Sequence, residues 1–495
     1  MDLAISTITG DLANRIISFL MSKYMDHVCS EEKVERLQQL LLRVGMVVEE
    51  ADSRYITNSC MLIQLKALAA AMYQGHHVLD TIKYRKHKEL VCDSSDLSVS
   101  TPNKRTRTIV GSAAQRVFNS ELIRALQNLE AGVANMAEFV VLLGGCETIS
   151  RRPYDAYLYV DNFMFGRHVE KQQIIRFLLH HNTPSSPAVL PIIGDAGVGK
   201  KTLVAHVCDV DRVRSHFSMI LHLNGDDLFK MKDHERLSGR ILVVVEFVSD
   251  VHEDDWITFY HLIMKMDRGS KVIILGRSTG LEKFGTIKPI SLNSLAFDEY
   301  MYLFKTLAFG STNRADYPWL AAMVEEFAIV LGGSLISANV LADALRKNLS
   351  AHFWLYRLKG ARDSVNKNIS CFGAHPQVLL SRGQPVHLIN RDHSMHLIGR
   401  YILSPAAPSG IVNSAIGMAN VPEEQGIGLP RIMFRDLISA AGHLVLPKGD
   451  FRLISWESRL PPYTSFSHLV HAVLSCVHDK PETSLSGKKR PCLFA

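Results

Sequence analysis

The chain has 495 residues, of which 47% are hydrophobic and 21% charged, and its formal net charge is +6. This is the composition of a globular protein with two to four domains, and the mild positive charge gives no clear sign of nucleic-acid binding. The eight cysteines form no CxxC pair, which argues against a zinc site or a disulfide framework and predicts a reducing compartment.

Residues 1–150 predict an α-helical bundle. Apolar residues at positions 34, 37, 41, 44 and 48, and again at 122, 126, 129, 133 and 136, follow the spacing of three and four that marks one helix face. The largely apolar run 63–79 suits a central helix, and Asp93–Arg107 is expected to form an exposed loop. No secretory signal and no membrane span are predicted. Without a catalytic constellation, this domain is expected to present a face to a partner.

Residues 160–290 alternate between strand and helix patterns, which predicts a parallel sheet covered by helices on both faces. The expected strands are Val189–Ile193, Met219–Leu223, Ile241–Val245 and Lys271–Leu275. Ligands bind beyond the carboxyl ends of the strands in such a sheet. The first strand runs directly into a glycine-rich segment at that edge.

This segment has the pattern Gly-x-x-x-x-Gly-Lys between a strand and a helix, the order required of a phosphate-binding loop. Its glycines let backbone N–H groups surround a phosphate at a helix N-terminus, and Lys200 reaches the outer phosphates. The predicted nucleotide-binding residues here are Gly194, Gly197, Val198, Gly199, Lys200, Lys201 and Thr202. Lys201 stands where a Ser or Thr normally ligates Mg²⁺, so a metal is doubtful and no metal ligand is assigned. Thr202 is one position late for the metal but within reach of an α-phosphate.

The strand Ile241–Val245 is expected to end where a phosphate-loop nucleotidase has a metal-binding Asp, and we place that position at Val245. Glu246 either faces the nucleotide or simply ends a buried strand. Lys201 either supplies positive charge in place of Mg²⁺ or points to solvent. Arg277, after the strand Lys271–Leu275, either contacts a γ-phosphate or pairs with a carboxylate. Because both metal positions are altered, efficient hydrolysis is not expected, and no catalytic residue is assigned.

Beyond residue 350, frequent prolines indicate an irregular region with short strands and helices. Strands are expected at Val386–Ile389 and Phe451–Ile454, and helices near Arg435–Ala441 and Phe466–Val477. The function of residues 351–495 is unassigned. The histidines at 375, 387, 393 and 396 fit no metal-site spacing and are expected on the surface or in packing contacts.

Several ordered motifs support a family resemblance. They are Phe165-Gly166-Arg167, the phosphate loop, His216-Phe217, the segment Ser291–Phe304, Leu331-Gly332-Gly333-Ser334-Leu335, and Met72–Asp80 with His76 and His77 in place of an acidic pair. Taken together in chain order, these motifs resemble the NB-ARC module and helical domain of plant coiled-coil disease-resistance proteins, the NLR family. The leucine-rich repeats usual in that family are absent from this sequence. The resemblance covers residues 1–350 and divides the chain into a helical domain (1–150), a P-loop nucleotide-binding domain (160–290), a helical ARC-like subdomain (291–350) and the unassigned region (351–495).

The resemblance implies an ADP- or ATP-binding protein of plant defence signalling, in the cytoplasm with the nucleus as an alternative location. The helical domain would pair with itself or with other immune receptors; no effector or host target is indicated. Two alternatives stay open: a nucleotide-independent adaptor or decoy, and a weak ATPase that uses Glu246 and Lys201 unconventionally.

Overall fold

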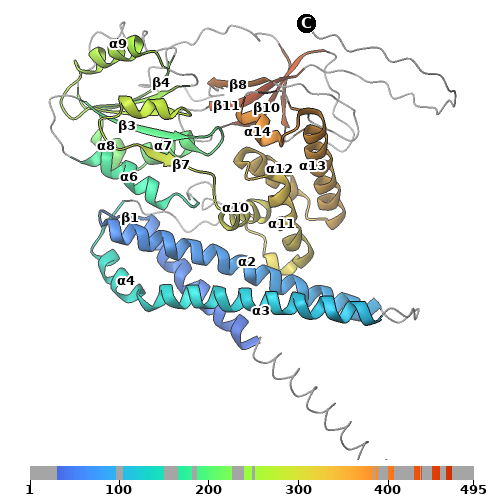
Figure 1. Cartoon of the computed structure of the whole chain (residues 1–495). Helices are drawn as coiled ribbons and strands as arrows, with labels where there is room; N and C mark the ends of the chain where they lie inside the picture. Colours follow the sequence, from blue (N-terminus) through green and yellow to red (C-terminus); the bar gives the residue numbers. More distant parts are fainter. Residues whose placement is uncertain are drawn as a thin grey trace, which may run out of the picture.

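The structure is a computed structural model that describes residues 31–95, 104–149, 165–180, 187–225, 239–247 and 251–382, and short segments between 384 and 470. Long helices of the N-terminal region lie along one side of the molecule, and the central sheet and the helices that follow it lie on the other (Figure 1). Within the described part of the chain, no helix has the length and hydropathy needed to cross a bilayer.

The N-terminal region is helical, as the apolar spacing predicts. It contains a helix over residues 31–52, α2 (Ser59–Ser95), α3 (Lys104–Ala134) and α4 (Met136–Gly144). Leu37, Val44, Tyr73 and Leu129 are fully buried between these helices. The short strands β1 (Arg54–Tyr55) and β2 (Glu147–Thr148) pair, which brings the segment between the first helix and α2 beside the end of the region. The loop predicted at 93–107 is shorter than expected, because α2 continues to Ser95 and α3 already begins at Lys104.

The central sheet is parallel, with the strand order β4-β5-β6-β3-β7. Its strands are β3 (Ala188–Gly194), β4 (Met219–Asn224), β5 (Ile241–Glu246), β6 (Lys271–Gly276) and β7 (Ile290–Leu292). The four predicted strands are confirmed to within one residue at each end, and β7 is an additional strand. Helices α6 (His168–Leu179), α7 (Lys200–Cys208) and α8 (Asp211–His216) pack on one face. Helix α9 (Glu253–Ile263) and the 3-10 helix η2 (Thr279–Phe284) cover the other.

A group of helices follows the sheet. It consists of α10 (Phe297–Phe309), α11 (Pro318–Leu331), α12 (Leu335–Lys347), α13 (Ala351–Phe372) and α14 (Pro376–Ser381). Their shared core contains the fully buried rings of Phe304, Phe327 and Trp354. Helices α10 and α11 pack on α2 of the N-terminal region, so this group joins the helical region to the sheet (Figure 1).

The C-terminal region contains short strands, as predicted, and they form a four-stranded sheet of order β8-β11-β10-β9. The strands are β8 (Arg400–Pro405), β9 (Arg431–Met433), β10 (Phe451–Glu457) and β11 (Thr464–Val470). The helix expected at 466–477 is wrong in its described part, because β11 is a strand that pairs with β10 and β8. Most of the helix expected at 435–441 lies outside the described residues, as does the second half of the strand expected at 386–389; its first half, Val386 and His387, is described and is not a strand.

Candidate functional site

The glycine-rich segment forms a tight loop between β3 and α7. Gly197 and Gly199 have φ angles of 76° and 93°, a left-handed conformation that side chains with a Cβ rarely adopt. Gly194 is required for a different reason: a Cβ there would overlap the carbonyl oxygen of Leu292 on β7. The loop therefore presents main-chain groups, and the nine-residue helix α7 begins directly behind it. This is the local geometry that favours a bound phosphate.

Lys200 lies against this loop. Its ammonium donates hydrogen bonds to the carbonyl oxygens of Gly194 (2.6 Å) and Asp195 (2.8 Å). Burial, with a further contribution from the positive charge of Arg277, lowers the pKa of Lys200 to about 8. Arg277 is exposed and directly follows β6, the neighbour of β3 in the sheet. The fold thus brings both predicted phosphate-contacting cations to one edge of the sheet.

Two residues outside the predicted set lie at the loop. Arg167 donates to the carbonyl of Val198 (3.3 Å) and to the carbonyl of Asn293, so it connects the start of α6, the loop and the segment after β7. Leu335, at the start of α12, lies where its Cδ1 would be 3.5 Å from a Cβ placed on Gly199. Both belong to motifs of the family resemblance, which is the one sequence signal that pointed to them.

The side chains of β5 alternate between the two faces of the sheet, and this decides which of them face α7. Val243 and Val245 pack in the cluster shared with α9, whereas Leu242 and Val244 pack in the cluster shared with α7. Glu246, next along the strand, returns to the α7 face. Val245 therefore faces away from α7 and Glu246 faces it, and the placement of the metal-Asp position at Val245 stays a prediction.

Lys201 and Glu246 form an ion pair, the Lys201 Nζ contacting the Glu246 Oε2. Their side chains are 23% and 19% exposed, so the pair is largely shielded from solvent. Lys201 therefore does not point away to solvent, and Glu246 does more than end the strand. A Mg²⁺ site of this fold needs a Ser or Thr hydroxyl and a free carboxylate here. The residues present do not fit that ion, and no group of three or more metal-ligating side chains occurs in the described part of the chain.

The predicted site residues are thus gathered in one place. Gly194, Gly197, Val198, Gly199, Lys200, Lys201 and Thr202 lie in the loop and the first turn of α7, with Arg277 beside Lys200. They differ in which of their atoms a ligand could contact. The Val198 side chain is 5% exposed and packs in the core, which leaves only its main chain for a ligand. Their roles in nucleotide binding stay predictions.

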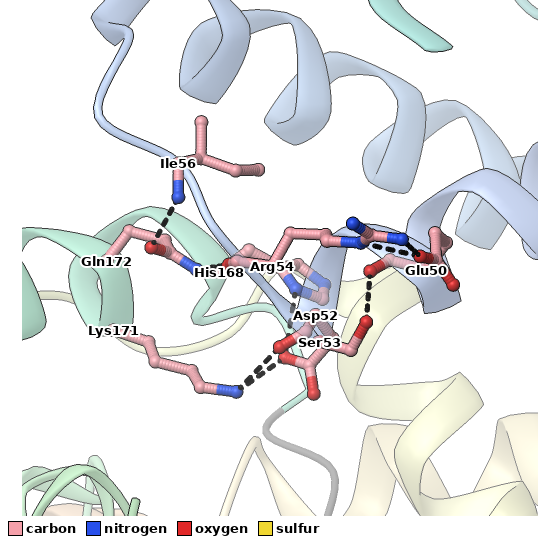
Figure 2. A network of polar contacts seen from close by, with 8 residues as sticks. All are labelled: Glu50, Asp52, Ser53, Arg54, Ile56, His168, Lys171 and Gln172. Atoms are coloured by element: carbon pink, nitrogen blue, oxygen red, sulfur yellow. Dashed lines mark hydrogen bonds and ion pairs between the residues drawn. The ribbon is translucent and has the colours of Figure 1, made fainter. Parts of the chain in front are cut away.

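A buried polar network fastens the N-terminal helices to α6 (Figure 2). The Lys171 ammonium lies 2.8 Å from the Asp52 carboxylate, and these side chains are 3% and 7% exposed. Gln172 accepts a hydrogen bond from the Ile56 N–H (3.1 Å) and donates to the Arg54 carbonyl (2.7 Å). Because α6 packs against α7, the network connects the helical region to the element that carries the loop lysines.

No family model matches the chain. The curated proteins similar to it include the putative disease resistance protein RGA4 of Solanum bulbocastanum, 24% identical over 69% of this chain and 37% of that protein. Disease resistance protein RGA2 of the same species is 22% identical over 68% and 36%. A putative disease resistance RPP13-like protein 1 of Arabidopsis thaliana is 22% identical over 64% and 33%. The resemblance to plant disease-resistance proteins is confirmed, and the chain spans just over a third of the length of the first two.

Solved structures with some likeness include the Drosophila ORC bound to DNA, at 12% identity and a TM-score of 0.30 over 44% of this chain and 70% of that chain. Cdc6p from Pyrobaculum aerophilum is 10% identical, with a TM-score of 0.25 over 47% and 72%. These scores carry no argument. The assignment of the α/β fold depends instead on the parallel strand order and on the strand–loop–helix unit described above.

Proposed function

We propose that this chain, which is similar to plant disease-resistance proteins of the NLR family, binds ADP or ATP at the loop 194–202 and acts in plant defence signalling. The observation that carries the proposal is the meeting of the glycine loop, Lys200 and Arg277 at the carboxyl edge of the parallel sheet. Main-chain N–H groups and cations that converge there suit a diphosphate or triphosphate. Lys200 would contact the β-phosphate and Arg277 the γ-phosphate.

A nucleotide switches a protein only if it binds two arrangements unequally. Arg167, before the loop in the chain, donates to it, and Leu335, after it, lies beside Gly199. A ligand that changes the loop would thereby act on α12 and the helices packed with it. A division of the chain into a helical domain (1–150), a nucleotide-binding domain (160–290), a helical subdomain (291–350) and a further region (351–495) is part of this proposal.

Weak or absent hydrolysis is also part of the proposal. The metal in this fold bridges the phosphates and neutralises charge in the transition state. Here Lys201 replaces the hydroxyl ligand and occupies the carboxylate of Glu246. The expected phosphate release is therefore slow, with or without Mg²⁺.

Isothermal titration of the full chain with ADP and with ATP tests the binding. Lys200→Ala should weaken both ligands by about tenfold or more, because a charged contact is removed from a part-buried site. Lys347→Ala is the matched control, since Lys347 is 58% exposed and pairs only with Asp343 of its own helix. Arg277→Gln should weaken ATP more than ADP. If the unmodified chain binds neither nucleotide, the proposal is wrong.

One observation favours a second candidate, a nucleotide-independent adaptor or decoy. The Lys200 ammonium already donates to two carbonyl oxygens of the loop itself, a contact that needs no ligand. The N-terminal helices would then carry the function by pairing with themselves or with other immune receptors. Leu42, Met46 and Ile63 support such a face, because they are large apolar side chains that are 60–69% exposed. Pairing that persists in Lys200→Ala, without nucleotide binding by the parent chain, would favour the adaptor.

The proposed location is the cytoplasm, with the nucleus as the alternative. The cysteines at 60, 146, 208 and 371 support a reducing compartment, because each is a free thiol.

A further inference from the structure

We propose that the Lys201–Glu246 ion pair takes the place of the divalent cation, so that this site binds metal-free nucleotide and gains no affinity from Mg²⁺. The inference rests on the proposed nucleotide binding and concerns the form of the ligand. It comes from a disagreement between the residues present and the metal that the fold implies.

The position of the pair supports the inference. Lys201 lies in the first turn of α7, where the metal-ligating hydroxyl would be, and Glu246 ends β5 on the face that packs against α7. The two residues that would hold the ion instead contact each other. Neither is fully exposed, so the contact is not a chance meeting of two surface side chains.

The chemistry of Lys201 and Glu246 does not allow the ion pair and a Mg²⁺ to occupy the site together. A protonated ammonium has three donors and no lone pair, so Lys201 can bind phosphate oxygens but cannot ligate a cation. A Mg²⁺ carried in on the phosphates would meet a positive charge at close range and would compete with it for Glu246. The neighbouring His222 on β4 offers no replacement charge, because burial and the charge of Lys201 lower its pKa to about 4 and keep it neutral.

The charges nearby are sufficient for a bare polyphosphate. Arg277, Lys201 and Glu246 each lie close enough to Lys200 for their charges to act on its pKa. When a nucleotide enters, Lys201 can extend from Glu246 toward the phosphates and keep the carboxylate as its second partner. The Lys201 ammonium then supplies one of the two positive charges that Mg²⁺ would bring, at the place where the ion would lie.

The test is isothermal titration of the full chain with ADP, once in excess EDTA and once in excess Mg²⁺. We expect the affinity in EDTA to equal or exceed that in Mg²⁺. Tightening by Mg²⁺ of more than about threefold would overturn the inference. Binding that requires Mg²⁺ overturns this inference alone, whereas no binding in either condition overturns the proposed function as well.

Two double variants separate the pair from the rest of the site. Lys201→Thr with Glu246→Asp introduces the hydroxyl and leaves a carboxylate without its lysine partner. Mg²⁺ should then tighten the binding of ADP by about tenfold. Lys201→Met with Glu246→Gln removes both charges at nearly constant shape, and should show no magnesium effect and weaker binding in EDTA. If the first variant gains no magnesium dependence while its thermal melting stays cooperative, the proposed position of the cation is wrong. Lys201→Met alone should lose about fivefold of the affinity in EDTA, and no loss would also contradict the inference.

Discussion

The imidazole of His77 on α2 lies 2.7 Å from a carboxylate oxygen of Asp298 on α10, 221 positions further along the chain. A carboxylate oxygen of Glu325 on α11 lies 3.8 Å from the other ring nitrogen. These contacts raise the pKa of His77 to about 9, chiefly through the hydrogen bond to Asp298 and next through the ion pair with Glu325. One charged imidazolium thus joins the N-terminal helices to the two helices packed on them.

This contact should make the packing of α2 on α10 and α11 depend on pH. The pKa of His77 is higher in the folded chain than its ordinary value of about 6.5, so its stabilisation is complete below that value and is lost as pH rises through about 9. His77→Gln should lower stability at pH 6 by about 1–2 kcal/mol, after allowance for partial exposure, and have little effect at pH 10. Thermal melting at both pH values measures this.

The control for this prediction is His352→Gln, at an exposed position of α13. It should have no pH-dependent effect. At the acid end, the ion pair with His77 lowers the pKa of Glu325. The stabilisation due to Glu325 is therefore present above its ordinary pKa of 4.5 and is lost as pH falls below that value. A His77→Gln deficit that is equal at pH 6 and pH 10 would contradict the charged contact.

The buried pair Lys171–Asp52 gives a second prediction. Lys171→Met leaves the Asp52 carboxylate buried, with the His168 ring nitrogen 3.8 Å away as its nearest recorded ionisable partner. Removal of one member of a buried pair costs about 3–5 kcal/mol, and the loss should appear in urea or thermal unfolding.

Replacement of both charges is the informative comparison with Lys171→Met. Lys171→Met with Asp52→Leu should recover most of the lost stability, because a buried pair and an apolar pair of similar volume are often equivalent. If the single variant is as stable as the parent chain, the pair does not fasten α6 to the N-terminal helices.

The sheet was predictable because its strands are short, apolar and β-branched, and because glycines or polar residues end them. The glycine loop was predictable for the same local reasons. What the pattern does not contain is the register of β5 relative to α7. A run of three valines followed by Glu246 has no polar residue to mark its faces, so the sequence did not show that Glu246, and not Val245, faces α7.

Contacts between distant segments could not be predicted from the sequence either. The sequence drew attention to Lys201, Glu246 and His77 one at a time, but the partner of each is fixed only by the fold. The helix predicted from residue 466 was wrong for a different reason. Their alternation of Ser with apolar residues matches a strand, yet the apolar run that continues to Val477 also suits a helix, and pairing with β10 and β8 decides for the strand.

The lowered pKa of Lys200 gives a prediction about ligand binding. In the free protein, Lys200 loses its proton as pH rises through about 8. Above that pH, Lys200 must take up a proton when a phosphate binds. ADP affinity in EDTA should therefore fall by about five- to tenfold between pH 7 and pH 9. Titrations in buffers of different ionisation enthalpy should show proton uptake at pH 9.

Lys200→Arg is the control for this pH effect, because a guanidinium stays charged throughout the range. It should bind more weakly than the parent at pH 7, since its shape differs, but with an affinity that is flat to pH 9. A parent chain whose affinity is equally flat would show that Lys200 is not the titrating contact.

The glycines of the loop give a graded prediction. Gly194→Ala places a methyl group against the Leu292 carbonyl on β7, a main-chain atom that cannot move without disturbing the β3–β7 pairing. Gly197→Ala meets no atom within 4 Å but keeps a φ of 76°, which costs about 1–2 kcal/mol. Gly360→Ala, in open space within α13, should stabilise the chain by about 0.5–1 kcal/mol. Thermal melting should rank Gly360→Ala above the parent, then Gly197→Ala, then Gly194→Ala. Because the Gly194 overlap lies in the loop itself, Gly194→Ala should also lose ADP binding, and retention of full affinity would show that the loop is not shaped by that close approach.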